Sequence, residues 1–220
     1  MKRRNLICLL AALAALATTD TAVAHPHVFS TMKTMILADD RGLVKAVGVE
    51  WTFDENYTQF ALEGLDLNSN GTYESEEIQP LTDENIKNLL ESQYFTFVKQ
   101  NGKLLEQAPV TEYGQSLNKD KLSLFFIVPL KQPVDPKAGA VELKVYDPDF
   151  FIAFDYEPKD ATKLQGKLAD GCKMDLKPLP STEEMEQTQA FLADKGTEWT
   201  PDQPTDFGSM FAQALVVSCG

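Results

Sequence analysis

The sequence predicts an α+β fold in which a mostly antiparallel, sandwich-like β core carries an inserted EF-hand-like helix–loop–helix. Two observations predict it. Short runs of β-branched and aromatic residues recur along the chain and are separated by Asn-Gly, Asp-Gly and Asp-Pro turns, which is typical of antiparallel strands. Residues 54–92 instead space their apolar side chains as helices do around a polar loop. We expect one domain over residues 25–220, with residues 1–24 outside it.

Residues 1–24 have the three parts of a secretory signal peptide. Residues 2–4 are basic, residues 6–17 form an apolar run, and Ala22-Val23-Ala24 is an A-x-A cleavage site. The apolar run is too short for an uncleaved anchor helix, which is the alternative interpretation. We therefore expect cleavage after Ala24 and a periplasmic protein. No later apolar run is long enough to span a bilayer, so the mature chain is not expected to insert into a membrane.

The charge balance excludes two classes of partner. The 220 residues include 20 Lys and Arg against 33 Asp and Glu, a net charge of −13 at pH 7. Nucleic acids and anionic lipid surfaces attract basic faces, so neither is expected as a partner. Three cysteines and two histidines are too few for a zinc site made only of Cys or only of His. A mixed site is possible by count, although the disulfide expected below would remove its thiolates.

A hairpin and two helices are expected first along the mature chain. The hairpin joins strands at residues 28–37 and 43–53, and both faces of the second strand carry apolar residues, so both should be partly buried. The first helix spans residues 54–65, with Asp54 as its N-cap. The second helix starts at residues 82–85, and its apolar stripe consists of Ile86, Leu89 and Leu90.

The remainder of the chain is predicted to be mainly strands. The Asn101-Gly102 pair is the strongest hairpin signal. Asp147-Pro148-Asp149 and Asp170-Gly171 are the other turns. A Glu-rich helix is expected at Ser181–Ala193, a linker at 196–206 and a short helix at Phe207–Ala214. The expected strands are residues 94–100, 103–107, 121–130, 141–146, 150–156, 163–169, 173–177 and 215–219.

The segment from Asp66 to Glu77 matches the twelve-residue EF-hand calcium loop. Calcium takes six to eight hard oxygen ligands, and a sharp turn at Gly71 would point alternate groups of this loop inward. Two of the three early side-chain ligands are Asn, which weakens binding to a dissociation constant of about 10⁻⁴–10⁻³ M, as suits a structural ion. The alternative is a loop of Asx turns without an ion. The expected ligands are Asp66, Asn68, Asn70, the Thr72 carbonyl, Glu74 through a water, and both oxygens of Glu77.

Both histidines of the chain lie at the expected mature N-terminus. Cleavage would make His25 the first residue and would cluster its α-amine with the imidazoles of His25 and His27. Such nitrogens bind Zn²⁺, Ni²⁺, Co²⁺ or Cu²⁺. Pro26 lacks an N–H, so a site built from successive deprotonated amides cannot form, and Asp147 or Asp149 would complete the coordination. The alternative is a solvated terminus.

The expected processing also changes the cysteine count. Cys8 leaves with the signal peptide, so Cys172 and Cys219 remain, and an oxidising compartment permits them to pair. Two free thiols are the alternative. No catalytic role is expected, because no histidine accompanies a serine in a recognisable nucleophile motif and Cys172 should be oxidised.

Five parts of the sequence resemble a known family. They are residues 24–29, residues 49–55, the Asp66–Glu77 loop, residues 145–151, and Gly171-Cys172 with Cys219. Together they resemble bacterial periplasmic proteins with the domain of unknown function 1007, often described as a periplasmic component of an uncharacterized ABC-type transport system. The resemblance implies a protein encoded near nickel/cobalt-type transporters, although the common form of the loop has Asp where this chain has Asn68 or Asn70.

These features together predict a periplasmic metal-binding accessory protein linked to transition-metal transport of nickel, cobalt or zinc. His25 and His27 would hold the transported ion, the Asp66–Glu77 loop would hold a structural Ca²⁺, and a membrane metal transporter would be the partner. The alternative function is a calcium-stabilised structural or protein-interaction domain without a transition metal.

Overall fold

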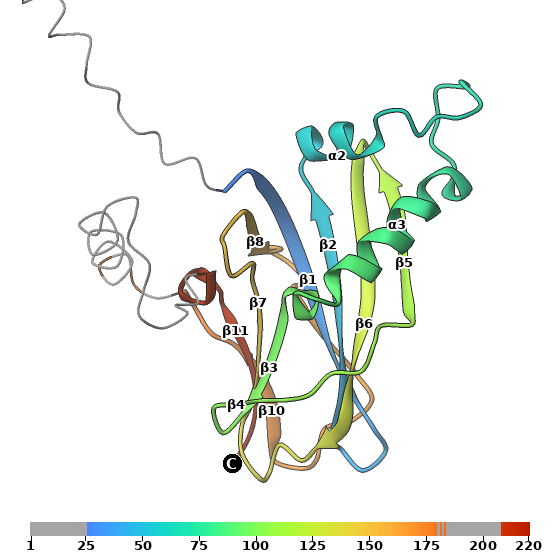
Figure 1. The fold of residues 1–220 in the computed structure, drawn as a ribbon. Helices are drawn as coiled ribbons and strands as arrows, with labels where there is room; N and C mark the ends of the chain where they lie inside the picture. Colours follow the sequence, from blue (N-terminus) through green and yellow to red (C-terminus); the bar gives the residue numbers. More distant parts are fainter. Residues whose placement is uncertain (1–25, 180, 182, 184–207) are drawn as a thin grey trace, which may run out of the picture.

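The computed structural model describes residues 26–179, 181, 183 and 208–220. The predicted signal peptide, His25, the linker expected at residues 196–206 and nearly all of the helix expected at Ser181–Ala193 lie outside these residues. Two β-sheets face one another, with few helices (Figure 1). The expectation of an α+β fold with a mostly antiparallel, sandwich-like core is therefore confirmed.

Sheet A contains six strands in the order β5-β6-β2-β1-β8, with β9 also paired to β1. The expected opening hairpin is confirmed as β1 and β2, which pair antiparallel. Strands β8 and β9 run parallel to β1, so the sheet is mixed. The strands are β1 (Val28–Ala38), β2 (Val44–Phe53), β5 (Glu112–Asn118), β6 (Lys121–Val134), β8 (Ile152–Tyr156) and β9 (Thr162–Gln165).

Sheet B contains five antiparallel strands in the order β10-β11-β7-β3-β4. The hairpin expected at Asn101-Gly102 is present between β3 and β4. The C-terminal strand β11 lies between β10 and β7. The strands are β3 (Thr96–Gln100), β4 (Lys103–Leu104), β7 (Val141–Val145), β10 (Cys172–Leu176) and β11 (Ala214–Cys219).

Two of the expected turns connect the sheets instead of closing a hairpin. The chain leaves β7 in sheet B and passes through residues 147–149 to β8 in sheet A. It returns from β9 in sheet A to β10 in sheet B around Asp170-Gly171. A turn sequence specifies a reversal of direction but not the strand that the chain meets afterwards. The strand expected at residues 103–107 is shorter, and β5, which is largely polar, was not predicted.

Trp51 on β2 is the largest side chain of the core and is 1% exposed. The rings of Phe53, Phe95, Phe126 and Phe154 surround it, with centroids 4.8–6.5 Å away. The same buried cluster includes Val98, Leu143 and Leu215 of sheet B. The core therefore fills the space between the two sheets, as a sandwich requires.

Helices α2 (Glu55–Leu62) and α3 (Ser75–Leu89) lie at one end of the sandwich, with α3 running along β5 (Figure 1). Asp54 caps α2 as predicted, because its side chain accepts a hydrogen bond from the Tyr57 N–H. The short helices η1 (Gln93–Phe95) and η2 (Gly208–Phe211) precede β3 and β11. Within the part of the chain that the structure describes, no helix is long and apolar enough to cross a membrane.

Candidate metal-binding sites

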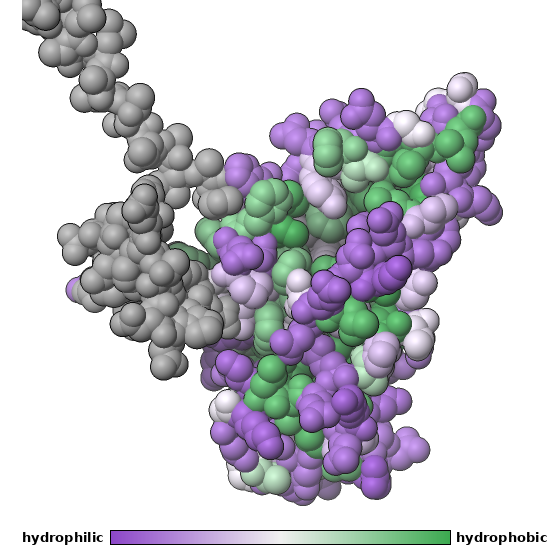
Figure 2. All heavy atoms as spheres, in the orientation of Figure 1, coloured by the Kyte–Doolittle hydropathy of each residue, from purple (hydrophilic) through white to green (hydrophobic). Residues whose placement is uncertain are grey.

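The loop between α2 and α3 projects from the body of the protein (Figure 1). It carries five of the six predicted calcium ligands, and the sixth, Glu77, lies in the first turn of α3. Its exposed surface and that of α3 are mainly hydrophilic, with apolar patches between (Figure 2). The six residues are connected by hydrogen bonds within this one loop. The predicted spacing therefore brings the donors together in space.

Asp66 and Asn70 shape the first half of the loop. The two carboxylate oxygens of Asp66 accept hydrogen bonds from the backbone N–H of Asn70 at 3.0 Å and of Gly71 at 2.9 Å. The side-chain oxygen of Asn70 accepts from the backbone N–H of Thr72 at 2.8 Å. Gly71 has a φ of 80°, a left-handed conformation that favours glycine. The sharp turn required at this position is present.

Glu77 closes the loop from the first turn of α3. Its Oε1 accepts a hydrogen bond from the Leu67 N–H at 2.9 Å, and its Oε2 accepts from the Glu74 N–H at 3.2 Å. Helix α3 begins at Ser75, seven residues earlier than the sequence predicted, and continues through Pro80. The prediction placed the start after the proline, whereas the structure keeps Glu77 inside the helix and aimed into the loop.

Glu74 is held as a carboxylate. Hydrogen bonds from the side chains of Asn70 at 2.9 Å and Thr72 at 2.7 Å lower the pKa of Glu74 from 4.5 to about 2. A depressed carboxyl pKa stabilises the fold above the ordinary pKa and loses that effect as the pH falls toward the lowered value. The loop therefore keeps this negative charge at any pH near neutrality.

The donors of the loop are carboxylates, amide oxygens and backbone carbonyls, which are the hard oxygen ligands of Ca²⁺. Among the described residues, no three His, Cys, Asp or Glu side chains converge as a metal-binding group. An EF-hand donor set with Asn at two positions does not require such a group, because only Asp66 and Glu77 would bind directly as carboxylates. The chemistry of the donor set fits calcium.

His27 lies where the expected mature N-terminus enters sheet A. Its backbone N–H donates to the carbonyl of Phe151 at 2.9 Å, and its ring lies 4.9 Å from the Phe151 ring. His25 lies outside the described residues. The turn at residues 147–151, which supplied the two candidate carboxylates, is therefore the neighbour of His27.

The two candidate carboxylates of this turn differ in their surroundings. Asp147 is buried, and its oxygens accept hydrogen bonds from the backbone N–H groups of Asp149, Phe151 and Ile152 at 3.0–3.1 Å. This geometry gives Asp147 a structural role in the turn. The side chain of Asp149 is exposed. Of the pair proposed from the sequence, Asp149 is the carboxylate accessible to a ligand.

A cavity of about 520 Å³ lies beside this turn and was not predicted. Phe95, Phe97 and Phe151 provide its apolar lining, and Glu91 and Asp149 contribute carboxylates. Residues 93–95 all have positive φ, between 48° and 54°, although none is glycine. The sequence gives no signal for this strained segment. Left-handed backbone is usually predicted from Gly or Asn, and residues 93–95 contain neither.

The disulfide between Cys172 and Cys219 is present, as expected. The two cysteines are directly paired residues of the antiparallel strands β10 and β11. The bond ties the C-terminal strand to the edge strand of sheet B.

The chain is similar to known proteins along nearly its whole length. The family described as "Protein of unknown function (DUF1007)" matches residues 10–219. An "Uncharacterized protein" of Haemophilus influenzae is 27% identical over 199 residues, which cover 90% of this chain and 92% of that protein. An "Uncharacterized 15.5 kDa protein in trpE 3'region" of Spirochaeta aurantia is 30% identical over 108 residues, covering 49% of this chain and 75% of that protein.

Proposed function

Since this chain belongs to the family of proteins of unknown function DUF1007, we propose its function from the geometry of its own sites. The protein is an exported, periplasmic, non-enzymatic metal-binding accessory of transition-metal transport, stabilised by a structural Ca²⁺ in an EF-hand-like loop. The observation that carries the proposal is the convergence of oxygen donors between α2 and α3. A membrane transporter of nickel, cobalt or zinc is the proposed partner.

The calcium part rests on the positions of Asp66 and Glu77 at the two ends of one loop. Asp66 follows the end of α2, and Glu77 in the first turn of α3 accepts a hydrogen bond from the backbone N–H of Leu67. A cation between these carboxylates would neutralise their charge and bridge the two helices, as in an EF-hand. Glu74, held as a carboxylate by Asn70 and Thr72, supports the ninth-position role through a water.

The transition-metal part rests on His27 and Asp149. The hydrogen bond from His27 to Phe151 directs the expected mature terminus to the turn that carries the exposed Asp149. In the proposed site the α-amine, the imidazoles of His25 and His27, and Asp149 bind the transported ion, a donor set that suits Ni²⁺, Co²⁺, Zn²⁺ or Cu²⁺. Asp147 is left out of the site, because its oxygens already serve the turn.

Calcium should raise the melting temperature of the processed protein. At a Ca²⁺ concentration of about 100 times the dissociation constant, binding adds about 2.7 kcal/mol to the free energy of unfolding. For a domain of this size the shift is about 5–10 °C relative to protein in a chelator. The measurement is thermal unfolding followed by circular dichroism.

Three variants distinguish the effect of bound calcium on the melting temperature from other changes in stability. Asp66→Ala and Glu77→Ala should each abolish the difference between calcium and chelator, whatever their own melting temperatures. Glu76→Ala is the matched control, because Glu76 is an exposed carboxylate of the same loop outside the expected ligand set, and it should retain the shift. Identical wild-type curves in calcium and chelator would remove the structural ion from the proposal.

Transition-metal binding should depend on the native mature terminus. We expect titration calorimetry of protein starting at His25 to show binding of at least one of Ni²⁺, Co²⁺, Zn²⁺ and Cu²⁺. The double change His25→Ala and His27→Ala should weaken it by on the order of a hundredfold, since it removes two imidazole ligands. Asp149→Asn should weaken it less. Equal affinity of the wild type and the double variant contradicts this part and favours the second function.

The second function is a calcium-stabilised interaction domain without a transition metal. Two exposed apolar side chains favour this second function. Phe60 on α2 and Leu67 in the loop between α2 and α3 are each 76% exposed. In that case the calcium shift persists and the histidine variants bind metals as the wild type does. The two titrations therefore separate the two functions.

A further inference from the structure

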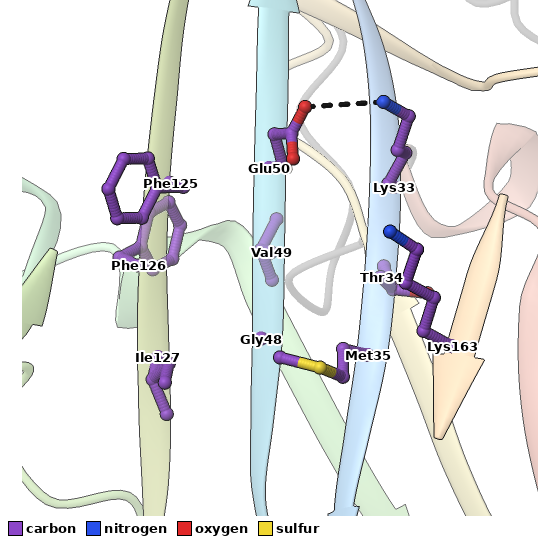
Figure 3. Close-up of a pocket in the computed structure, with 10 residues that line it drawn as sticks. All are labelled: Lys33, Thr34, Met35, Gly48, Val49, Glu50, Phe125, Phe126, Ile127 and Lys163. Carbon is purple, nitrogen blue, oxygen red and sulfur yellow. Dashed lines mark hydrogen bonds and ion pairs between the residues drawn. The ribbon is translucent and has the colours of Figure 1, made fainter. Parts of the chain in front are cut away.

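The outer face of sheet A carries an apolar strip that the metal sites do not use. The strip consists of Met35 on β1, Gly48 on β2, and Phe125 and Ile127 on β6 (Figure 3). Phe125 is 47% exposed. The outer face of a sandwich is ordinarily polar, so a contiguous apolar strip on it indicates a covered surface. The apolar residues on the two faces of β2, noted from the sequence, therefore belong partly to the core and partly to this strip.

Two glycines make the strip flat. A Cβ on Gly48 would lie 3.0 Å from the Cε of Met35, and a Cβ on Gly114 would lie 2.5 Å from the Cζ of Phe125. Met35 and Phe125 can lie across the neighbouring strands only because these positions have no side chain. A hollow of about 240 Å³ remains above the strip. A flat apolar sheet face with a shallow hollow suits packing against another sheet.

The charges at the strip are balanced. Lys33 Nζ lies 3.3 Å from Glu50 Oε1 and neutralises it (Figure 3). The strand registers place Lys163, Met35, Gly48, Ile127 and Glu112 in one row across five strands. The row thus begins with a cation and ends with an anion. Within the described ranges, neither Lys163 nor Glu112 forms an ion pair.

We propose that this strip is the interface of a homodimer, in which the outer face of sheet A packs against the same face of a second copy. A two-fold axis that lies between the sheets and runs along β2 reverses the strand order. It therefore brings Lys163 of each copy opposite Glu112 of the other, and Met35 opposite Ile127. Such a self-complementary surface is what an isologous dimer requires.

The balanced charge of this face favours self-association there. A net charge of −13 opposes self-association wherever acidic side chains dominate. At the strip, Lys33 and Lys163 balance Glu50 and Glu112, so the two facing surfaces carry no net charge. Glu50 meets Glu50 of the second copy on the axis, and Lys33 of each copy neutralises it. The proposed interface uses residues of sheet A and none of the metal-binding residues. It can therefore be correct or wrong independently of the proposed function.

Sedimentation equilibrium of the processed full-length chain tests the dimer. The wild type is expected to be dimeric at micromolar concentration, and Phe125→Glu should raise the dimer dissociation constant by on the order of a hundredfold, as for an aromatic anchor at an interface. Leu104→Glu is the matched control, because Leu104 is also an exposed apolar side chain on a strand but lies on β4 in sheet B, away from the outer face of sheet A. It should leave the dimer intact, and circular dichroism checks that both variants fold.

A charge swap tests the arrangement of the two copies. Lys163→Glu and Glu112→Lys should each weaken the dimer by on the order of tenfold, and the double variant should restore it. A wild-type monomer throughout the micromolar range overturns the proposal, and so does a dimer that Phe125→Glu leaves unchanged. Failure of the double variant to restore a dimer that both single variants weaken overturns the two-fold axis along β2.

Discussion

Replacing Trp51 by alanine is expected to lower the free energy of unfolding by about 3–5 kcal/mol, the range for removing a fully buried large aromatic side chain. Trp51 is 1% exposed, and four phenylalanine rings surround it between the two sheets. No side chain nearby can fill the cavity without leaving its own position in the core. Urea unfolding followed by far-ultraviolet circular dichroism measures the change.

Trp51→Phe is the matched control for that experiment. The indole Nε1 of Trp51 is buried and has no hydrogen-bond partner in the described structure. An unpaired buried N–H costs about 1–3 kcal/mol, so phenylalanine loses packing area but removes this penalty. The phenylalanine variant should therefore lose much less stability than the alanine variant. Equal losses in the two variants would contradict the packing account of this site.

Replacing both Cys172 and Cys219 by serine is expected to destabilise the protein by about 4 kcal/mol, because the disulfide closes a loop with a sequence separation of 47 residues. In the chain-entropy account the bond acts by restricting the unfolded chain. The direct pairing of the two residues in β10 and β11 means that the serine variant can keep the strand register. Chemical denaturation should show a lower midpoint in the variant.

The wild type under reducing conditions provides the comparison for the serine variant. Its midpoint should fall to that of the serine variant, whereas the variant itself should not respond to reductant. A serine variant as stable as the oxidised wild type would show that the bond contributes nothing to folding. A calcium shift that persists in the variant would show that the proposed structural ion and the disulfide stabilise the fold independently, as expected for a site between α2 and α3 and a bond in sheet B.

Local chemistry explains which parts of the fold could be predicted. The opening hairpin and the Asp54 cap depend on neighbours in sequence, and both were predicted correctly. Helix α3 starts at Ser75 despite Pro80, because Glu77 anchors its first turn to the loop. Strand β5 forms because it pairs with β6 and packs under α3, and its own polar residues carried no strand signal.

The candidate sites show the same division. The clustering of Asp66, Asn68, Asn70, Thr72, Glu74 and Glu77 was predicted, since these residues follow a fixed spacing within twelve residues; calcium binding stays a prediction. The turn at Asp147 was predicted, but the burial of its side chain was not, because burial depends on the residues that pack around the turn in the folded protein. Which strands share a sheet was likewise beyond prediction at the two turns that cross between sheets, so the cavity beside residues 93–95 could not be foreseen.

The position of β11 in sheet B has a consequence for how the chain is made. Strand β11 follows the other strands in the sequence, yet it is an inner strand, paired on one side with β10 and on the other with β7. Until residues 214–219 arrive, β7 presents an unpaired edge and Cys172 has no partner. Sheet B is therefore completed only once residues 214–219 have been synthesised. A chain that lacks residues 214–219 would leave β7 with an open, aggregation-prone edge.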